Sequence, residues 1–214
     1  MTVSAVLFDC DGVVVDSEGA TFDLLAEDIK AYGISLSHAE MEGMFLGGTM
    51  YGVGMALRQT SPEVPEDWAD RFYQKLYAHL AKGTPLIPGI EEVLDALDAA
   101  GLPYAIGSNG TGAKMQVTLG QHPALLARFK GHVYSGQDLG TPKPAPDLYL
   151  HAAAQLGVDP AQAVVVEDSP NGAMAARAAG MRCLGYAPLG NAALAAVGAE
   201  LFSDMRALPG LLGL

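Results

Sequence analysis

Five short apolar segments, separated by helical patterns, constrain the fold of this chain more than any other feature of its sequence. The segments are Val3–Phe8, Pro103–Gly107, His132–Tyr134, Ala163–Val166 and Arg182–Gly185. Most are continuous apolar runs rather than alternating ones, which is typical of strands in a parallel sheet covered by helices on both faces. The alternation of strand and helix therefore predicts an α/β fold with a doubly wound, Rossmann-like parallel sheet.

The helical segments between these strands carry recognisable start and stop signals. Apolar residues recur at helical spacing over 90–97 and 148–156, and a glycine follows each stretch. The dipeptide Ser169-Pro170 starts an alanine-rich helix that we expect to end at Gly180.

The stretch between Ser17 and Gly83 breaks the alternation, because it contains helical patterns and no convincing strand. About 65 residues are too many for one crossover connection. We therefore expect a small all-α domain, residues 17–83, inserted into an α/β core of residues 1–16 and 84–214, with hinges near Asp16–Ser17 and Lys82–Pro88. Ligands of open α/β sheets bind outside the carboxyl ends of the strands, so this insertion is expected to lie over the binding crevice as a lid.

Acidic residues follow two of the predicted strands. Asp9 and Asp11, with Gly12, come after the first strand, and Glu167-Asp168 come after the fourth. Like charges about 4 Å apart repel by about 4 kcal/mol at an effective dielectric of about 20, so such acids require a cation or a proton. Carboxylates from several strand ends suit Mg²⁺. The alternatives are a solvated turn for the first cluster and a helix N-terminal acid pair for the second.

Two further polar clusters provide groups that can bind an anion. Ser108-Asn109-Gly110 opens a helix expected near Thr111, where a hydroxyl and backbone amides form either an anion site or a plain N-cap. Lys143 is flanked by the three prolines of 141–146, which fix its backbone; a surface lysine in a rigid loop is the alternative. All four clusters map to one edge of one sheet, so together they predict a site for a divalent metal and a phosphate.

The charge balance excludes several kinds of partner. The chain has 24 acidic and 12 basic side chains, a formal net charge of −12, which argues against a nucleic-acid or membrane-surface footprint. No apolar run approaches the ~20 residues of a membrane span or has the form of a signal peptide, so we expect a cytoplasmic protein. The two cysteines cannot build a disulfide scaffold or a cysteine-based zinc site.

The order and spacing of these motifs resemble the haloacid dehalogenase superfamily. The matching motifs are Asp9-x-Asp11-Gly12-x-x-x-Asp16-Ser17, Ser108-Asn109, Lys143-Pro144 and Glu167-Asp168. The helical insertion stands in the position of that family's α-helical cap. Within the superfamily, the first motif, the Ser108-Asn109-Gly110 segment and Lys114-Met115 are most similar to bacterial sugar-phosphate phosphatases, the 6-phosphogluconate phosphatases among them.

The resemblance implies Mg²⁺-dependent hydrolysis of a small phosphate monoester, a sugar or sugar-acid phosphate, by a monomer. It implies that Asp9 attacks phosphorus to form an aspartyl phosphate and that Asp11 acts first as acid and then as base. Ser108 and Lys143 are then expected to hold the phosphate oxygens.

The implied metal site and substrate contacts involve further residues. Mg²⁺ is expected on the carboxylates of Asp9 and Asp168 and the backbone carbonyl of Asp11, with Glu167 helping directly or through water. The remaining substrate-contact candidates are Gly12, Asn109, Lys75 and Lys114, although a solvated surface position is the simpler interpretation for both lysines.

Two other functions stay open at this point. The β-phosphoglucomutase branch carries a histidine after the hinge and an arginine in the cap loop, where this chain has Thr21 and Met50. No lysine or arginine lies between Lys30 and Arg58, and we expect 45–54 to form a glycine-rich, apolar loop, so hydrolysis is favoured over mutase chemistry. A catalytically silent protein that binds phosphorylated ligands is the third possibility.

Overall fold

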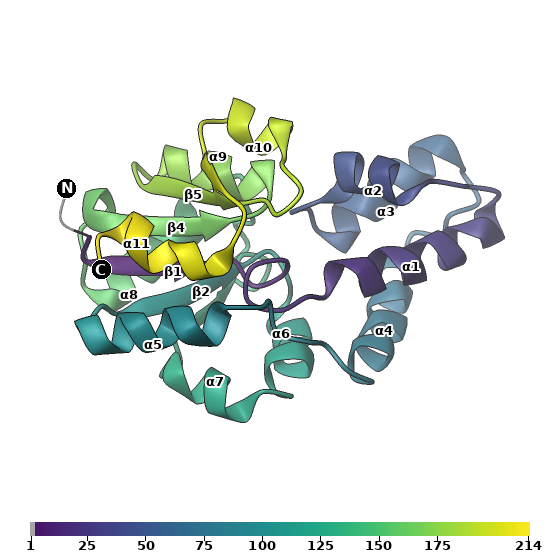
Figure 1. Cartoon of the computed structure of the whole chain (residues 1–214). Coiled ribbons are helices and arrows are strands. Elements are labelled where there is room, and N and C mark those ends of the chain that lie inside the picture. Colours follow the sequence, from purple (N-terminus) through teal and green to yellow (C-terminus); the bar gives the residue numbers. More distant parts are fainter. Residues whose placement is uncertain (1–2) are drawn as a thin grey trace.

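The computed structural model describes residues 3–214 and contains a six-stranded parallel sheet (Figure 1). The strands are β1 (Ala5–Phe8), β2 (Tyr104–Ser108), β3 (Val133–Ser135), β4 (Ala163–Glu167), β5 (Arg182–Tyr186) and β6 (Glu200–Phe202). Their order is β3-β2-β1-β4-β5-β6, and every neighbouring pair is parallel. The expected doubly wound α/β fold is confirmed.

Helices cover both faces of this sheet. The first face packs against α5 (Ile90–Ala100), α6 (Gly112–Leu119), α7 (Pro123–Arg128), the 3₁₀ turn η3 (Met205–Ala207) and α11 (Leu208–Leu212). The second packs against α8 (Asp147–Leu156), α9 (Pro170–Ala178) and α10 (Ala192–Ala196), and the 3₁₀ turn η2 (Pro160–Gln162) precedes β4. Along β1, Val6 and Phe8 enter the first apolar layer and Leu7 the second. This two-sided burial explains why the strands are continuous apolar runs.

The helix stop signals function as the sequence predicts, whereas one strand lacks any signal. Helices α5 and α8 end before Gly101 and Gly157, which take left-handed φ values of +66° and +69°. The strand that the sequence did not predict is β6, which has three residues at the sheet edge, two of them exposed. Such a short edge strand needs no apolar run, so the pattern that revealed the other strands is missing.

Four helices follow β1 before the chain returns to α5, and we call residues 18–80 the helical insert. They are α1 (Glu18–Ile29), α2 (His38–Phe45), α3 (Met50–Thr60) and α4 (Trp68–Leu80), with the 3₁₀ turn η1 (Lys30–Tyr32) after α1. The insert has its own apolar core, in which the rings of Trp68 and Phe72 stack with centroids 5.0 Å apart. Figure 1 shows it beside the sheet rather than on either face.

The chain leaves and re-enters the core through two paired linkers. Val15 and Leu86 form an antiparallel bridge, and the Asp16 backbone N–H donates to the Pro85 carbonyl at 2.8 Å. These paired linkers join the helical insert to the sheet.

The prediction of a loop over residues 45–54 is largely wrong. Helix α2 continues to Phe45, and Thr49 caps α3 by accepting from the Gly52 backbone N–H. Residues 46–49 alone connect the two helices.

Within residues 3–214, no helix combines the length and apolarity that crossing a bilayer requires.

Candidate active site

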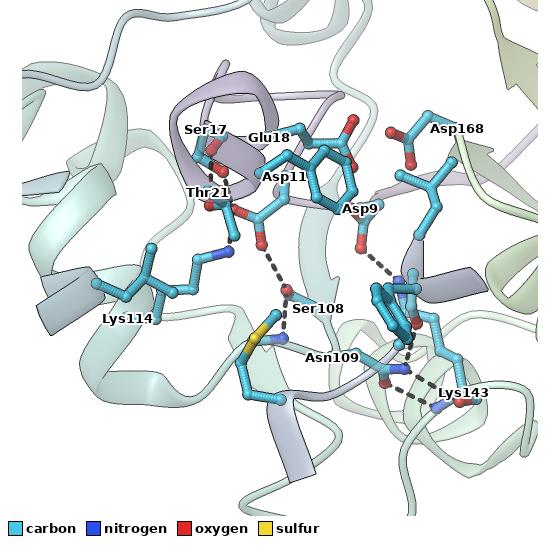
Figure 2. Close-up of a pocket in the computed structure, with 18 of the residues that line it drawn as sticks. Asp9, Asp11, Ser17, Glu18, Thr21, Ser108, Asn109, Lys114, Lys143 and Asp168 are labelled. Atoms are coloured by element: carbon cyan, nitrogen blue, oxygen red, sulfur yellow. Dashed lines mark hydrogen bonds and ion pairs between the residues drawn. The ribbon is translucent and has the colours of Figure 1, made fainter. Parts of the chain in front are cut away.

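Strand register brings the polar clusters together at the carboxyl edge of the sheet. Phe8 on β1 lies opposite Val166 on β4, and the Asp9 backbone N–H donates to the Val166 carbonyl at 2.9 Å. Strand β2, on the other side of β1, ends at Ser108. As a result, one pocket between the sheet edge and the helical insert is lined by residues from all the predicted clusters (Figure 2). These residues are Asp9, Asp11, Ser108, Asn109, Gly110, Lys143 and Asp168, and Lys114 from outside the clusters also lines the pocket.

Lys143 is the centre of a buried ion network. Its side chain is 2% exposed, and its ammonium group donates to Asp9 and, at 2.6 Å, to Glu167. Glu167 is fully buried and also accepts from the Tyr149 hydroxyl at 2.7 Å and the Ser169 hydroxyl at 2.9 Å. Burial alone would lower the pKa of Lys143, but the two carboxylates outweigh it and raise that pKa. The lysine is therefore a permanent cation held at a fixed position.

Asp11 has a different set of partners on the opposite side of the pocket. It pairs with the Lys114 ammonium at 2.8 Å and accepts hydrogen bonds from Ser17 and, at 3.4 Å, from Ser108. Burial favours a higher pKa for Asp11, but Lys114 and the Ser17 hydroxyl outweigh it and lower the pKa. The Lys114 side chain is only 11% exposed, so the solvated-surface interpretation of this lysine is wrong.

Three carboxylates form a group that can hold a metal ion. Asp9, Glu167 and Asp168 each offer an oxygen within 4.8 Å of the others. Burial raises the pKa of Asp9 to about 7 despite Lys143, with Glu167 and Asp11 adding to the increase. Burial, together with neighbouring acids, also raises the pKa of Asp168. A divalent cation with oxygen ligands would relieve this excess of negative charge, so the donor set fits Mg²⁺.

Asn109 connects three segments of the pocket. Its side-chain oxygen accepts from the Lys143 backbone N–H at 2.7 Å. Its side-chain nitrogen donates to the carbonyls of Lys143 at 3.0 Å and Gly47 at 2.9 Å. Asn109 therefore fixes the loop that carries Lys143 and ties that loop to the helical insert. The following helix α6 begins at Gly112, close to the expected start, and Thr111 caps it by accepting from the Lys114 backbone N–H.

Two predicted substrate contacts do not line the pocket. Gly12 has a left-handed φ of +78°, and a Cβ atom there would lie 2.0 Å from an Asp168 oxygen. Its conformation lets Asp168 approach the turn after β1. Lys75 is 59% exposed and pairs with Asp28 inside the helical insert, so the simpler interpretation of a surface lysine describes it.

The sequence did not single out Glu18 as a site residue, yet it lines the pocket as the first residue of α1. Burial raises its pKa to about 8, with the charges of Asp11 and Asp9 adding to the effect. The only available signal was its place beside Ser17 at the hinge, where an acid also suits the first turn of a helix.

A second pocket residue outside the motifs is Tyr73 from α4. Its hydroxyl accepts from the Gln137 side chain at 2.9 Å, and Gln137 in turn donates to the Asn109 backbone carbonyl. In the sequence, Tyr73 belongs to a set of aromatic and apolar residues within 72–77 that packing within the insert alone would explain, so the sequence carried no sign of this contact.

Comparison with known proteins finds relatives that match most of this chain. A 6-phosphogluconate phosphatase from Escherichia coli is 31% identical over 188 residues, which cover 84% of this chain and 80% of that protein. The bifunctional riboflavin kinase/FMN phosphatase of Arabidopsis thaliana is 30% identical over 190 residues, 85% of this chain, but the match spans only 48% of that longer protein.

Solved structures agree with the fold. A haloacid dehalogenase-like protein of unknown function from Agrobacterium tumefaciens superposes with a TM-score of 0.83 at 33% identity, covering 99% of this chain and 98% of that one. A haloacid dehalogenase family hydrolase from Deinococcus radiodurans, solved with bound phosphate and sodium, gives 0.77 at 36% identity, covering 99% and 96%. The family model for haloacid dehalogenase-like hydrolases matches residues 3–180, and the chain belongs to this family.

Proposed function

We propose that the protein hydrolyses a small phosphate monoester through an aspartyl-phosphate intermediate, with Mg²⁺ as cofactor. The observation that carries the proposal is the convergence of Asp9, Asp11, Lys143 and Asp168 on one pocket from three separate stretches of the chain. The relatives suggest a sugar or sugar-acid phosphate as substrate. A monomeric state and a cytoplasmic location stay predictions of the sequence.

Asp9 is the proposed nucleophile. Its carboxylate would attack phosphorus in line, forming an oxygen–phosphorus bond while the bond to the leaving alcohol breaks. Lys143 lies against Asp9 and is placed to balance negative charge on the phosphoryl oxygens, and Ser108 offers a hydroxyl to the same group. Asp9 and Asp168 would hold Mg²⁺, which supplies further charge neutralisation when bound. Both Glu167 oxygens already accept hydrogen bonds, which favours a contact through water.

Asp11 is the proposed acid and base. Its lowered pKa makes Asp11 a carboxylate at neutral pH. A phosphate dianion arriving beside it would raise that pKa and favour the protonated form that a general acid needs. After the alcohol has left with this proton, Asp11 is again a carboxylate and can take a proton from the water that hydrolyses the intermediate.

We further propose that residues 17–83 act as a cap domain over the phosphatase core formed by residues 1–16 and 84–214. The separate apolar core of the insert and its paired linkers support this division. Closure would exclude water during attack on the ester.

The decisive experiment is phosphate release from a panel of phosphate esters, with and without Mg²⁺, by the wild type and Asp9→Asn. We expect Mg²⁺-dependent release by the wild type and a loss of at least about 10³-fold in the variant, because an amide cannot replace the nucleophile. Thermal stability should be nearly unchanged, since Lys143 keeps Glu167 as a partner. Residual turnover near the wild-type level would mean that the nucleophile is misassigned.

The same experiment separates the alternatives. Conversion of glucose 1-phosphate to another sugar phosphate without phosphate release would indicate mutase chemistry. Binding of esters with no Mg²⁺-dependent release would indicate a non-catalytic binding protein.

A further inference from the structure

The helical insert presents an apolar surface to the pocket. We call this surface the apolar wall, and its side chains are Phe22, Phe45, Leu46, Met50, Tyr73 and Leu76. They come from all four helices of the insert or the loop after α2, and together they face the charged sheet edge.

The polar groups within this surface already have partners in the protein. The Thr21 hydroxyl donates to the Ser17 carbonyl at 2.7 Å, and the Tyr73 hydroxyl is bonded to Gln137. In the loop after α2, the Gly47 carbonyl accepts from Asn109, and the Gly48 backbone N–H donates to Phe45. The insert therefore has few free hydrogen-bonding groups to offer a substrate along this wall.

The wall also lacks positive charge that could bind an anionic group of the substrate. Among the described residues that line the pocket, the cations are Lys114 and Lys143, and both belong to the core and are paired with carboxylates. The charged residue that the insert contributes is Glu18, which stands beside Asp168 near the carboxylate group rather than on the wall. A second anionic group on the substrate would meet no positive charge there.

We infer that the substrate is a monophosphate whose end farthest from the phosphate is apolar, such as a deoxygenated sugar, a hydrocarbon ring or an alkyl chain. In this respect it differs from the fully hydroxylated sugar or sugar-acid phosphate that the relatives suggest. The inference rests on the proposed function, because it assumes that the phosphate occupies the sheet edge and that the leaving group therefore meets the wall. Hydroxyl groups pressed against the wall would lose bonds to water without replacement. A carboxylate or a second phosphate against the wall would lose more hydration free energy than a hydroxyl group.

The test compares three esters of primary alcohols, so that the bond broken is the same in each. They are cyclohexylmethyl phosphate, glucose 6-phosphate and 6-phosphogluconate, which present a hydrocarbon ring, a hydroxylated ring and a carboxylate. We expect kcat/KM with Mg²⁺ to be at least about tenfold higher for cyclohexylmethyl phosphate than for the other two. Equal or higher values for either sugar compound would overturn the inference.

Two methionines of α3 give a matched pair of variants. Met50 is half-buried on the wall, whereas Met55 is 62% exposed on the same helix and does not line the pocket. Met50→Lys should lower kcat/KM for cyclohexylmethyl phosphate about tenfold and raise it for 6-phosphogluconate. Met55→Lys should keep the wild-type order of substrates. Identical behaviour of the two variants would overturn the inference. If Met50→Lys does not fold, Met50→Gln replaces it in the comparison, because glutamine adds polarity at this position without adding charge.

The inference and the proposed function fail in different ways. The absence of Mg²⁺-dependent phosphate release from all three esters and from p-nitrophenyl phosphate would count against the function. Calorimetric binding of the three esters to Asp9→Asn, with Mg²⁺ present, then still tests the wall. Tighter binding of cyclohexylmethyl phosphate would support it, and tighter binding of a sugar compound would refute it.

Discussion

The sheet edge and the helical insert face one pocket with opposite chemistry. The edge contributes buried acids and lysines arranged by strand register, and the insert contributes hydrocarbon from a separate apolar core. Strand register allows little adjustment, because a shift by one residue turns every side chain to the other face. Helix packing in the insert tolerates substitutions that keep volume and apolarity. We infer that the edge determines the reaction, whereas the insert determines which ester is accepted.

Two lysines, one from each region, differ in the same way as the sheet edge and the insert. Lys143 at the edge and Lys75 in the insert each pair with a carboxylate that is at least nine-tenths buried. The Lys143 side chain is 2% exposed and shared by two acids, whereas that of Lys75 is 59% exposed and pairs with Asp28. Asp28 keeps a second donor, the Trp68 indole N–H at 2.8 Å.

The largest difference between the regions should therefore come from Lys143→Ala against Lys75→Ala. Removing Lys143 leaves Asp9 and Glu167 without their cation, so we expect a loss of about 3–5 kcal/mol in the free energy of unfolding. kcat/KM should also fall by at least about 10²-fold, because a charged contact to the phosphoryl group is lost.

Lys75→Ala should change stability by less than about 1 kcal/mol and leave kcat/KM unchanged, since the Lys75 side chain is exposed and Asp28 keeps the Trp68 indole as a donor. Urea unfolding and steady-state kinetics measure both quantities. Similar effects of the two substitutions would remove the distinction between the regions.

The excess of acid at the edge predicts how Mg²⁺ binding depends on pH. Burial raises the pKa of Asp9 to about 7 from an ordinary value near 4. Between these values the folded protein binds more protons than the unfolded chain, so Asp9 makes the metal-free protein less stable as pH rises through this range. Mg²⁺ binds the deprotonated form and reverses this loss.

We accordingly expect Mg²⁺ to raise the Tm more at pH 8 than at pH 6. Its affinity should fall by about tenfold for each pH unit below about 7 if one proton is displaced. Thermal unfolding with and without Mg²⁺ at several pH values tests this, and Asp9→Asn, which cannot titrate, should show a weaker dependence. A Tm increase that is the same at every pH would contradict the assignment of Asp9.

The sequence predicted the sheet edge far better than the wall, for a physical reason. In a parallel sheet, residues that directly follow neighbouring strands must meet, so Asp9, Ser108 and Asp168 could be grouped from the chain alone. Lys114 was harder, because its burial depends on Asp11, a partner more than a hundred residues away. Lys75 was proposed as a substrate contact, and its place within the insert depends on helix packing that periodicity does not encode.

Contacts between the insert and the core were the least predictable. Tyr73 and Gln137 are 64 residues apart, and neither belongs to a motif. An aromatic residue at helical spacing is equally consistent with a purely internal position, as for Phe72 one residue earlier. Only the arrangement of α4 over the edge decides which aromatic side chain meets the core.

The smallest effect we expect tests this contact with Tyr73→Phe against Tyr51→Phe. The Tyr73 hydroxyl reaches Gln137 on the core, whereas the Tyr51 hydroxyl donates to Asp70 within the insert at 2.7 Å. Losing the first bond should weaken closure and lower kcat by a few-fold, about 1 kcal/mol, with Mg²⁺ affinity unchanged. Tyr51→Phe should leave kcat at the wild-type value. Steady-state kinetics and Mg²⁺ titration of both variants distinguish a contact that positions the insert from one that only stabilises it. An equal change of kcat in the two variants would mean that the Tyr73–Gln137 hydrogen bond has no specific role in turnover.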